Sequence, residues 1–269
     1  MSTPKQPTKQ ERRDAAREAR AQAEQAEAAA AQRKKRLTVI LGAIGAVAVI
    51  AIVLIATTGG SDSPGKVDKS GKLPGTADVT AMLADIPQEG IKLGDPKAKV
   101  TVVEFIDPQC PICKEFANNV FPTIVQDYVR PGKILYEVRT LSFLGPDSVK
   151  GAQFLNAAGL QNKMYNATEL LYRNQGQENS GYMTDEFLES IGNSIPGFDT
   201  PKALADMKTE AAQNALGEAN TLAQKYGVTG TPTVMVGKTG GTLAKIDSND
   251  PTSVDQFKSG IDAALNLNK

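Results

Sequence analysis

The pattern of hydrophobic and polar positions predicts a β-sheet that starts after about residue 90. Runs of apolar and β-branched residues at 100–106, 133–141 and 233–237 are typical of buried strands. Residues 91–95 are expected to start the sheet, and residues 242–246 follow a Gly-Gly turn as a hairpin partner. Because a helical pattern separates strand 100–106 from strand 133–141, we expect those two strands to be parallel.

Apolar residues at helical spacing predict helices between and around these strands. Phe116, Val120, Ile124 and Tyr128 recur at intervals of four residues and describe one face of a helix. The stretch from about 147 to 226 is mostly helical in pattern, and we expect its last helix to run unbroken from Thr200 to Tyr226. This stretch is too long for a simple crossover, so it predicts a helical insertion between two strands of the sheet. A short helix near residue 78 and a last helix after residue 250 complete the pattern.

The N-terminal part of the chain has a different pattern and predicts three further segments. Residues 1–36 are polar and lack an apolar face, which favours a solvated tail. Residues 37–57 carry no charge and are rich in Leu, Ile and Val, which is typical of a transmembrane helix of about 20 residues. Residues 58–75 are rich in Gly, Ser, Pro and Lys and predict a flexible linker. Residues 76–269 then form the folded domain.

The positions of the basic residues predict an orientation for this apolar segment. Residues 33–36 are all basic and lie directly before it, so the positive-inside rule places the N-terminus in the cytoplasm. The sequence thus predicts a single-pass protein of the cell membrane with an extracytoplasmic C-terminal domain. A cleaved signal peptide is the alternative, although its apolar region is usually shorter and closer to the N-terminus.

Composition narrows the possible chemistry. The chain holds 30 Lys or Arg and 30 Asp or Glu, and no basic patch with interleaved aromatics appears after residue 57, so we expect no nucleic-acid partner. It has two cysteines and no histidine. A structural zinc site needs four Cys or His ligands, and an iron–sulfur cluster or a covalently attached haem needs ligands that are absent here.

The two cysteines lie in the motif Cys110-Pro111-Ile112-Cys113, directly after the strand 100–106. A cysteine at the start of a helix is close to unpaired backbone N–H groups and to the positive end of the helix dipole, which both stabilise a thiolate. We therefore expect Cys110 to attack and the more buried Cys113 to resolve. An inert structural disulfide is the alternative, but a loop this short gains little stability from closure.

A second feature is Pro232, which directly precedes an apolar strand. A trans proline pairs poorly in that position. We therefore hypothesise a cis peptide bond between Thr231 and Pro232, although only about 5–6% of X–Pro bonds are cis in folded proteins.

Taken together, these elements resemble a thioredoxin-fold oxidoreductase of the DsbA-like class, with membrane-anchored bacterial members as the most similar type. The resemblance covers roughly residues 91–269. It depends on the strand that ends at the CxxC motif, the helical insertion, and the Thr-Pro pair before the hairpin. It implies an α/β thioredoxin fold with a helical insertion, and no cofactor other than a redox-active Cys110–Cys113 disulfide.

The resemblance also implies roles for individual residues. Cys110 is expected to attack, Cys113 to resolve, and Thr231 with Pro232 to hold the substrate backbone. Glu104 occupies the position of a buried acid that relays the proton of Cys113 and tunes its pKa. The alternative for Glu104 is a polar residue at the end of a strand that faces solvent.

The active-site turn departs from the pattern of strongly oxidising members, which usually have histidine where this chain has Ile112. Without an imidazolium the pKa of Cys110 is expected to be higher and the protein a weaker oxidant. One pKa unit is about 1.4 kcal/mol, or about 30 mV for a two-electron couple. The direction of electron flow therefore stays open.

The leading hypothesis is an oxidase that introduces disulfides into exported proteins and is reoxidised by a membrane redox partner. A reductase or isomerase of the same chemistry is the first alternative, although no added dimerisation domain of the kind that isomerases often have is visible in the sequence. A non-catalytic binding or chaperone module with a thioredoxin fold is the second. No second cysteine pair is present, which argues against a peroxidase.

Overall fold

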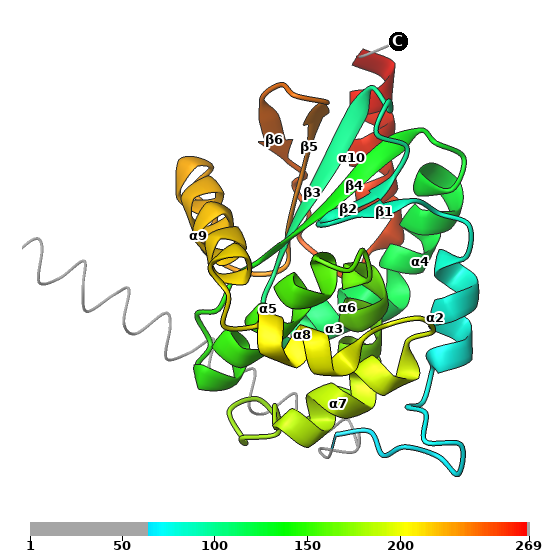
Figure 1. The fold of residues 1–269 in the computed structure, drawn as a ribbon. Helices are drawn as coiled ribbons and strands as arrows, with labels where there is room; N and C mark the ends of the chain where they lie inside the picture. Colours follow the sequence, from blue (N-terminus) through cyan, green and yellow to red (C-terminus); the bar gives the residue numbers. More distant parts are fainter. Residues whose placement is uncertain (1–63, 268–269) are drawn as a thin grey trace, which may run out of the picture. The chain divides into compact units, whose positions relative to one another are not determined.

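The computed structural model describes residues 64–267, and in these residues a mixed sheet of six strands organises the fold (Figure 1). The strand order is β1-β2-β4-β3-β5-β6. The strands are β1 (Gln88–Glu89), β2 (Lys92–Gly94), β3 (Val100–Ile106), β4 (Ile134–Thr140), β5 (Thr233–Lys238) and β6 (Leu243–Lys245).

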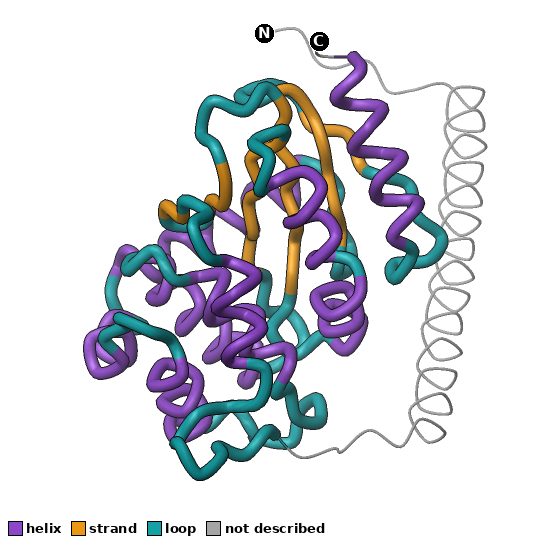
Figure 2. The backbone as a smooth tube through the Cα atoms, turned by 90° about the vertical axis from the view of Figure 1, so that its right-hand side faces the viewer, coloured by secondary structure: helices purple, strands orange, loops and turns teal. Residues whose placement is uncertain are grey.

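Helices precede, interrupt and follow this sheet along the chain. They are α2 (Thr76–Leu83), α3 (Pro111–Asn119), α4 (Phe121–Ile124), the π-helical turn η1 (Val125–Val129), α5 (Pro146–Gly159), α6 (Met164–Arg173), α7 (Asp185–Ser194), α8 (Thr200–Asp206), α9 (Glu210–Lys225) and α10 (Val254–Leu267). Figure 2 shows the strands enclosed between helices. The predicted α/β fold with a helical insertion is thus confirmed.

Strand β3 lies in the interior of the sheet and positions the CxxC motif at its carboxyl end. It pairs in parallel with β4, from Val100 opposite Ile134 to Ile106 opposite Thr140. It pairs antiparallel with β5 on its other side. All seven of its residues are buried, which explains the nearly continuous apolar run in the sequence. The predicted parallel pairing of these two strands is confirmed.

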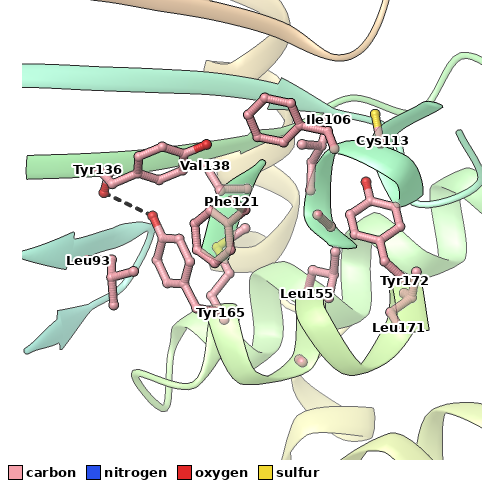
Figure 3. Close-up of a cluster of buried hydrophobic side chains, with 14 of the residues drawn as sticks. Leu93, Ile106, Cys113, Phe121, Tyr136, Val138, Leu155, Tyr165, Leu171 and Tyr172 are labelled. Carbon is pink, nitrogen blue, oxygen red and sulfur yellow. Dashed lines mark hydrogen bonds between the residues drawn. The ribbon is translucent and has the colours of Figure 1, made fainter. Parts of the chain in front are cut away.

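The two faces of the sheet bury different cores. On one face Val103, Phe105 and Met235 pack with Ala219 and Ala223 of α9. The opposite face belongs to a larger core that includes α3, α6 and α10. In the part of this core shown in Figure 3, the hydroxyl of Tyr165 donates a hydrogen bond to the carbonyl oxygen of Tyr136 at 2.9 Å. Alternate residues of β3 therefore face different helices, as the two-residue period of a strand requires.

The insertion between β4 and β5 consists of α5 to α9, and its last part differs from the prediction. The helix expected from Thr200 to Tyr226 is two helices, α8 and α9. Thr209 ends the interruption between them, because its hydroxyl accepts a hydrogen bond from the N–H of Ala212 and caps α9. Asp199, rather than Thr200, caps α8 by accepting from the N–H of Lys202 at 3.0 Å.

The helix after the CxxC motif is likewise interrupted. It divides at Val120 into α3 and α4, and continues as η1. Pro122 lies in the first turn of α4, where its missing N–H and its ring disfavour a continuous helix. The apolar face predicted from the sequence is nevertheless buried throughout, since Phe116, Val120, Ile124 and Tyr128 are each at most 3% exposed.

The prediction of a single-pass membrane protein is corrected here. Within residues 64–267 no helix has the length and the apolar character needed to cross a membrane. The longest helix in that range, α9, has 16 residues and carries charged side chains, whereas a bilayer span needs about 20 apolar residues. The predicted tail 1–36 and span 37–57 lie outside the described residues, so the structure does not support the predicted anchor or its orientation.

Candidate active site at the CxxC turn

Cys110 lies where the sheet gives way to helix α3. The chain leaves β3 at Ile106, turns, and enters α3 at Pro111, so that Cys110 is the N-cap residue. Its sulfur accepts a hydrogen bond from the backbone N–H of Cys113 at 3.4 Å. Pro111 is well suited to this first turn because its missing N–H would have no partner there. The strand-to-helix junction therefore directs free N–H groups at the sulfur, as the sequence predicts.

The two sulfurs differ in burial and in acidity. Both thiols are free, so the structure shows the reduced dithiol, in which Cys110 is 6% exposed and Cys113 is fully buried. A hydrogen bond from the Cys113 thiol, with further bonds from the Thr231 side chain and from backbone N–H groups, lowers the pKa of Cys110 to about 7 against the effect of burial. Burial and the neighbouring Cys110 raise the pKa of Cys113 well above its usual value. This asymmetry makes Cys110 the nucleophile of the pair.

This pKa predicts how fast the Cys110 thiol is alkylated as the pH changes. Only the thiolate reacts, so the rate of iodoacetamide labelling should rise with pH and reach half of its maximum near pH 7. At that pH the thiolate fraction is about 50 times that of a cysteine with a pKa of 9.0. Peptide mapping distinguishes the Cys110 adduct from that of Cys113. A midpoint above pH 8.5 would contradict the contribution of the hydrogen bonds to the sulfur.

The loop before β5 contacts Cys110 from the other side. The Cys110 thiol donates a hydrogen bond to the carbonyl oxygen of Thr231 at 3.3 Å. The peptide bond between Thr231 and Pro232 is cis, which confirms the hypothesis from the sequence. Both residues are partly exposed. The fold thus brings together two motifs that lie 121 residues apart.

Glu104 is a buried acid within the same core. It is 5% exposed, and one carboxylate oxygen accepts a hydrogen bond from the hydroxyl of Tyr136 at 2.7 Å. Burial raises the pKa of Glu104 to about 8, and negative charge on Cys110 adds to the rise, while the bond from Tyr136 opposes it. A charge on Glu104 also contributes to the raised pKa of Cys113. The alternative in which Glu104 faces solvent is therefore wrong.

Apolar side chains are exposed in the turn and in the loop after β4. Ile112, in the middle of the CxxC motif, is 42% exposed, and Phe143 is 54% exposed. The backbone N–H of Phe143 donates to the carboxylate of Asp107 at 3.0 Å, which places this loop beside the turn. Large exposed apolar side chains beside a reactive group favour contact with apolar segments of a partner.

Several polar residues that hold the turn were not recognised in the sequence. The side-chain amide of Gln175 donates to the carbonyl oxygens of Pro108 and Cys110 at 3.0 and 3.3 Å. The hydroxyl of Tyr172 donates to the carbonyl oxygen of Asp107 at 3.0 Å. In the sequence Asp107 indicates only the end of a strand, Tyr172 ends a predicted helical segment, and Gln175 belongs to no motif. Their roles depend on contacts over 65 residues or more.

Within residues 64–267 no three His, Cys, Asp or Glu side chains are grouped so that they could hold a metal ion. The expectation that the protein uses no cofactor beyond its own disulfide stays a prediction. The arrangement of the described residues supports thiol–disulfide exchange through the two sulfurs.

Comparison with known proteins agrees with this geometry. A sequence model of the thioredoxin family matches residues 87–263. The chain is 30% identical over 176 residues to a probable disulfide bond formation protein D from Bacillus cereus, covering 64% of this chain and 77% of that protein.

Two solved structures share the fold of the described residues. Oxidised BdbD from Bacillus subtilis superposes with a TM-score of 0.57 and 21% identity, over 77% of this chain and all of that one. DsbA from Chlamydia trachomatis superposes with a TM-score of 0.56 and 21% identity, over 66% of this chain and 92% of that one. Since the family match includes both the CxxC turn and the cis proline, the chain belongs to the thioredoxin family as a DsbA-like thiol:disulfide oxidoreductase.

Proposed function

We propose that this oxidoreductase oxidises pairs of thiols in exported proteins by transferring its Cys110–Cys113 disulfide to them. The observation that best supports disulfide exchange is the contrast between an acidified, slightly exposed Cys110 and a fully buried Cys113 beside a buried acid. The name of its Bacillus cereus relative, a probable disulfide bond formation protein, favours oxidation as the direction. Exported proteins are the substrate class because disulfides persist in oxidising compartments.

The reaction begins from the oxidised form, with a bond between the two sulfurs. A substrate thiolate attacks the Cys110 sulfur, and the bond to Cys113 breaks with its electron pair on Cys113. A second substrate thiolate then attacks the substrate sulfur of the mixed disulfide and releases Cys110 as a thiolate. The substrate loses two electrons and two protons, and the CxxC pair gains two electrons.

In this mechanism Glu104 delivers the proton that Cys113 needs. With a pKa of about 8 the carboxyl group is mostly protonated at neutral pH, so it can act as an acid inside the core. The thiolate of Cys113 is strongly disfavoured by burial and takes up a proton. We therefore propose proton transfer from Glu104 to Cys113 as the first disulfide opens.

Thr231 and Pro232 are proposed to hold the substrate backbone. In the reduced protein the Thr231 carbonyl oxygen accepts the Cys110 thiol hydrogen. In the mixed disulfide Cys110 has no such hydrogen, so this oxygen becomes free to accept a backbone N–H of the substrate. Pairing of this kind recognises an extended segment without requiring particular side chains.

A separate redox partner has to remove the two electrons after each turnover. The two cysteines of this chain form a single redox pair, so no internal thiol can reoxidise it. We propose a membrane redox protein in this role, because a continuous oxidase needs a reaction that carries electrons away.

A reductase is the second candidate, and one observation favours it. The pKa of about 7 for Cys110 resembles thioredoxin, for which about 7 is typical, more than DsbA, for which about 3.5 is typical. Ile112 supplies no positive charge that would lower the pKa further. A less acidic thiol gives a less oxidising disulfide.

The reduction potential distinguishes the two candidates. The full chain would be equilibrated with glutathione buffers, and the free thiols would then be trapped and counted. We expect a value less negative than about −200 mV, which suits a disulfide donor. A value near about −270 mV, the thioredoxin range, would reverse the proposed direction. A variant in which both cysteines are replaced has no thiol to trap, so it supplies the baseline of the thiol count.

A further inference from the structure

Asp107 follows β3 directly and has an unusually complete set of hydrogen bonds for a buried acid. Its side chain is fully buried. One carboxylate oxygen accepts from the backbone N–H groups of Phe143 and Leu144 at 3.0 and 3.3 Å. The other accepts from the N–H of Gln109 at 2.9 Å and from the hydroxyl of Ser148. Hydrogen bonds to a charged acceptor are among the stronger ones in proteins.

The donors around Asp107 come from three separate segments. Gln109 belongs to the approach to the CxxC turn, Phe143 and Leu144 to the loop after β4, and Ser148 to the first turns of α5. The backbone carbonyl oxygen of Asp107 also accepts from the N–H of Cys110 at 2.9 Å. One residue therefore joins the reactive turn to the beginning of the helical insertion.

The loop held by Asp107 carries the exposed Phe143. A side chain that is 54% exposed receives little support from packing, so its position depends on its backbone. That backbone is fixed at two successive N–H groups by the same carboxylate oxygen. Since the carbonyl of the same residue holds Cys110, the distance between the apolar loop and the reactive sulfur is set through Asp107.

We propose that Asp107 is a positioning residue, which fixes the loop at Phe143 and Leu144 relative to Cys110 and thereby sets how efficiently the protein engages extended protein substrates. This inference deepens the proposed function and depends on it. A substrate whose cysteine meets Cys110 has neighbouring residues that extend beyond the turn, and apolar neighbours gain from burial against Phe143. A small dithiol has no such neighbours and needs only the sulfur.

The substitution Asp107→Asn separates the engagement of extended protein substrates from the reaction with a small dithiol. The asparagine replaces one of the two accepting oxygens with an NH₂ donor, so in either orientation of the amide at least one backbone N–H that Asp107 holds loses its acceptor. The bonds that remain are made to a neutral oxygen and are weaker than those to a carboxylate. The variant thus loosens the hold on the loop, while the backbone carbonyl oxygen of residue 107 can still accept from the N–H of Cys110.

The experiment compares the full-length wild type with Asp107→Asn on two substrates: a reduced peptide with apolar residues beside its cysteines, and dithiothreitol. Oxidised glutathione is the oxidant that restores the CxxC disulfide after each turnover. We expect kcat/KM for the peptide to fall about tenfold, mainly through KM, because misplacing a contact group weakens productive binding. The rate with dithiothreitol should change less than about twofold, because that reaction uses none of the lost contacts. Equal losses on both substrates, or no loss on either, would overturn the proposal.

Phe143→Ala provides the second arm. It should lower kcat/KM for the peptide by a similar factor, and the double variant with Asp107→Asn should be no worse than either single one, since both act through the same loop. Leu160→Ala is the matched control, because Leu160 is also an exposed apolar residue, at 49% exposure, at the end of α5. Fully additive losses in the double variant would contradict the inference.

A measurement on the wild type keeps the inference testable should Asp107→Asn fail to fold. Hydrogen exchange at the amides of Phe143 and Leu144 should be slow, because both are bonded to a buried acceptor. Rapid exchange at both amides would overturn the role of Asp107. If the wild type itself does not oxidise the peptide, the proposed oxidase function fails, whereas the Asp107 contrast can still be measured with an oxidised peptide in the reverse direction.

Discussion

Replacing Cys110 with serine is expected to reduce thiol oxidation of protein substrates to the uncatalysed background. A hydroxyl group cannot form the disulfide, and the remaining Cys113 is fully buried with a raised pKa, so it cannot take over the attack. The measurement starts from a reduced, unfolded substrate protein whose activity depends on disulfides, and it follows the recovery of that activity. A stoichiometric amount of the oxidised wild type serves as the reference. Replacing Cys113 should abolish this oxidation as well, because the disulfide that is transferred needs both sulfurs.

The partner variant Cys113→Ala should behave differently. Cys110 can still attack a substrate disulfide, but no thiol is present to resolve the product, so a mixed disulfide accumulates. Non-reducing gels of acid-trapped samples should show adducts that disappear with reductant and are absent from the double variant. If Cys110→Ser instead kept the full effect on substrate folding, the activity would belong to a non-catalytic binding function of the fold.

The parts of the fold that the sequence predicts well are those with a strong local pattern. Strand β3 is a continuous apolar run, and the helix after it repeats its apolar residues at intervals of four. Because each signal is contained within a few neighbouring residues, the sequence predicts the parallel pairing of β3 with β4 and the buried face of the helix. Cys110 and Cys113 are equally easy to find, because cysteine is rare in the chain and its chemistry depends on the motif itself.

Local interruptions are harder to predict, because they depend on small differences between competing bonds. Residues 200–226 keep a helical pattern of apolar residues across the position where α8 ends. Only the cap at Thr209 indicates the division, and a threonine within a helix is common enough to be overlooked. In the helix after Cys113, Pro122 gives the corresponding signal.

The surroundings of the site are predictable only in part, because their partners are distant in sequence. Glu104 alternates with apolar residues in a strand buried on both faces, so the pattern cannot distinguish a buried acid from an exposed one. Its partner Tyr136 comes from the neighbouring strand, 32 residues later. The network around Asp107 likewise joins residues 36 to 41 positions apart. The tertiary fold, rather than any local motif, brings these groups together.

The buried acid leads to the second large prediction, that Glu104→Gln stabilises the protein at neutral and alkaline pH. In the unfolded chain the carboxyl group has its ordinary pKa of 4.5, and in the fold burial raises the pKa to about 8. Between these values the folded state binds more protons than the unfolded state, so stability falls as pH rises through this window. At about 1.4 kcal/mol per pKa unit, the free energy of unfolding is lower by about 5 kcal/mol above pH 8.

Glutamine does not titrate and escapes this loss. Urea unfolding between pH 4.5 and 9 should therefore show a free energy of unfolding that declines less with pH in Glu104→Gln than in the wild type. Burial also raises the pKa of Glu169, which contributes the same decline to both proteins. Glu115→Gln is the matched control, since Glu115 is an exposed residue of α3 and should leave the pH dependence unchanged. Parallel curves for the wild type and Glu104→Gln would contradict the raised pKa of Glu104.

The same substitution should slow catalysis, which explains why a destabilising group can be useful in this position. Glutamine cannot donate a proton to the Cys113 thiolate, so the first opening of the disulfide should be slower by about 10²-fold, the lower end of what a positioned acid contributes. Stopped-flow reduction of the oxidised protein measures this step. In the wild type its rate should fall as Glu104 loses its proton near pH 8, once the thiolate fraction of the attacking thiol is taken into account. If Glu104→Gln is more stable than the wild type but its disulfide opens at the wild-type rate, Glu104 does not transfer the proton.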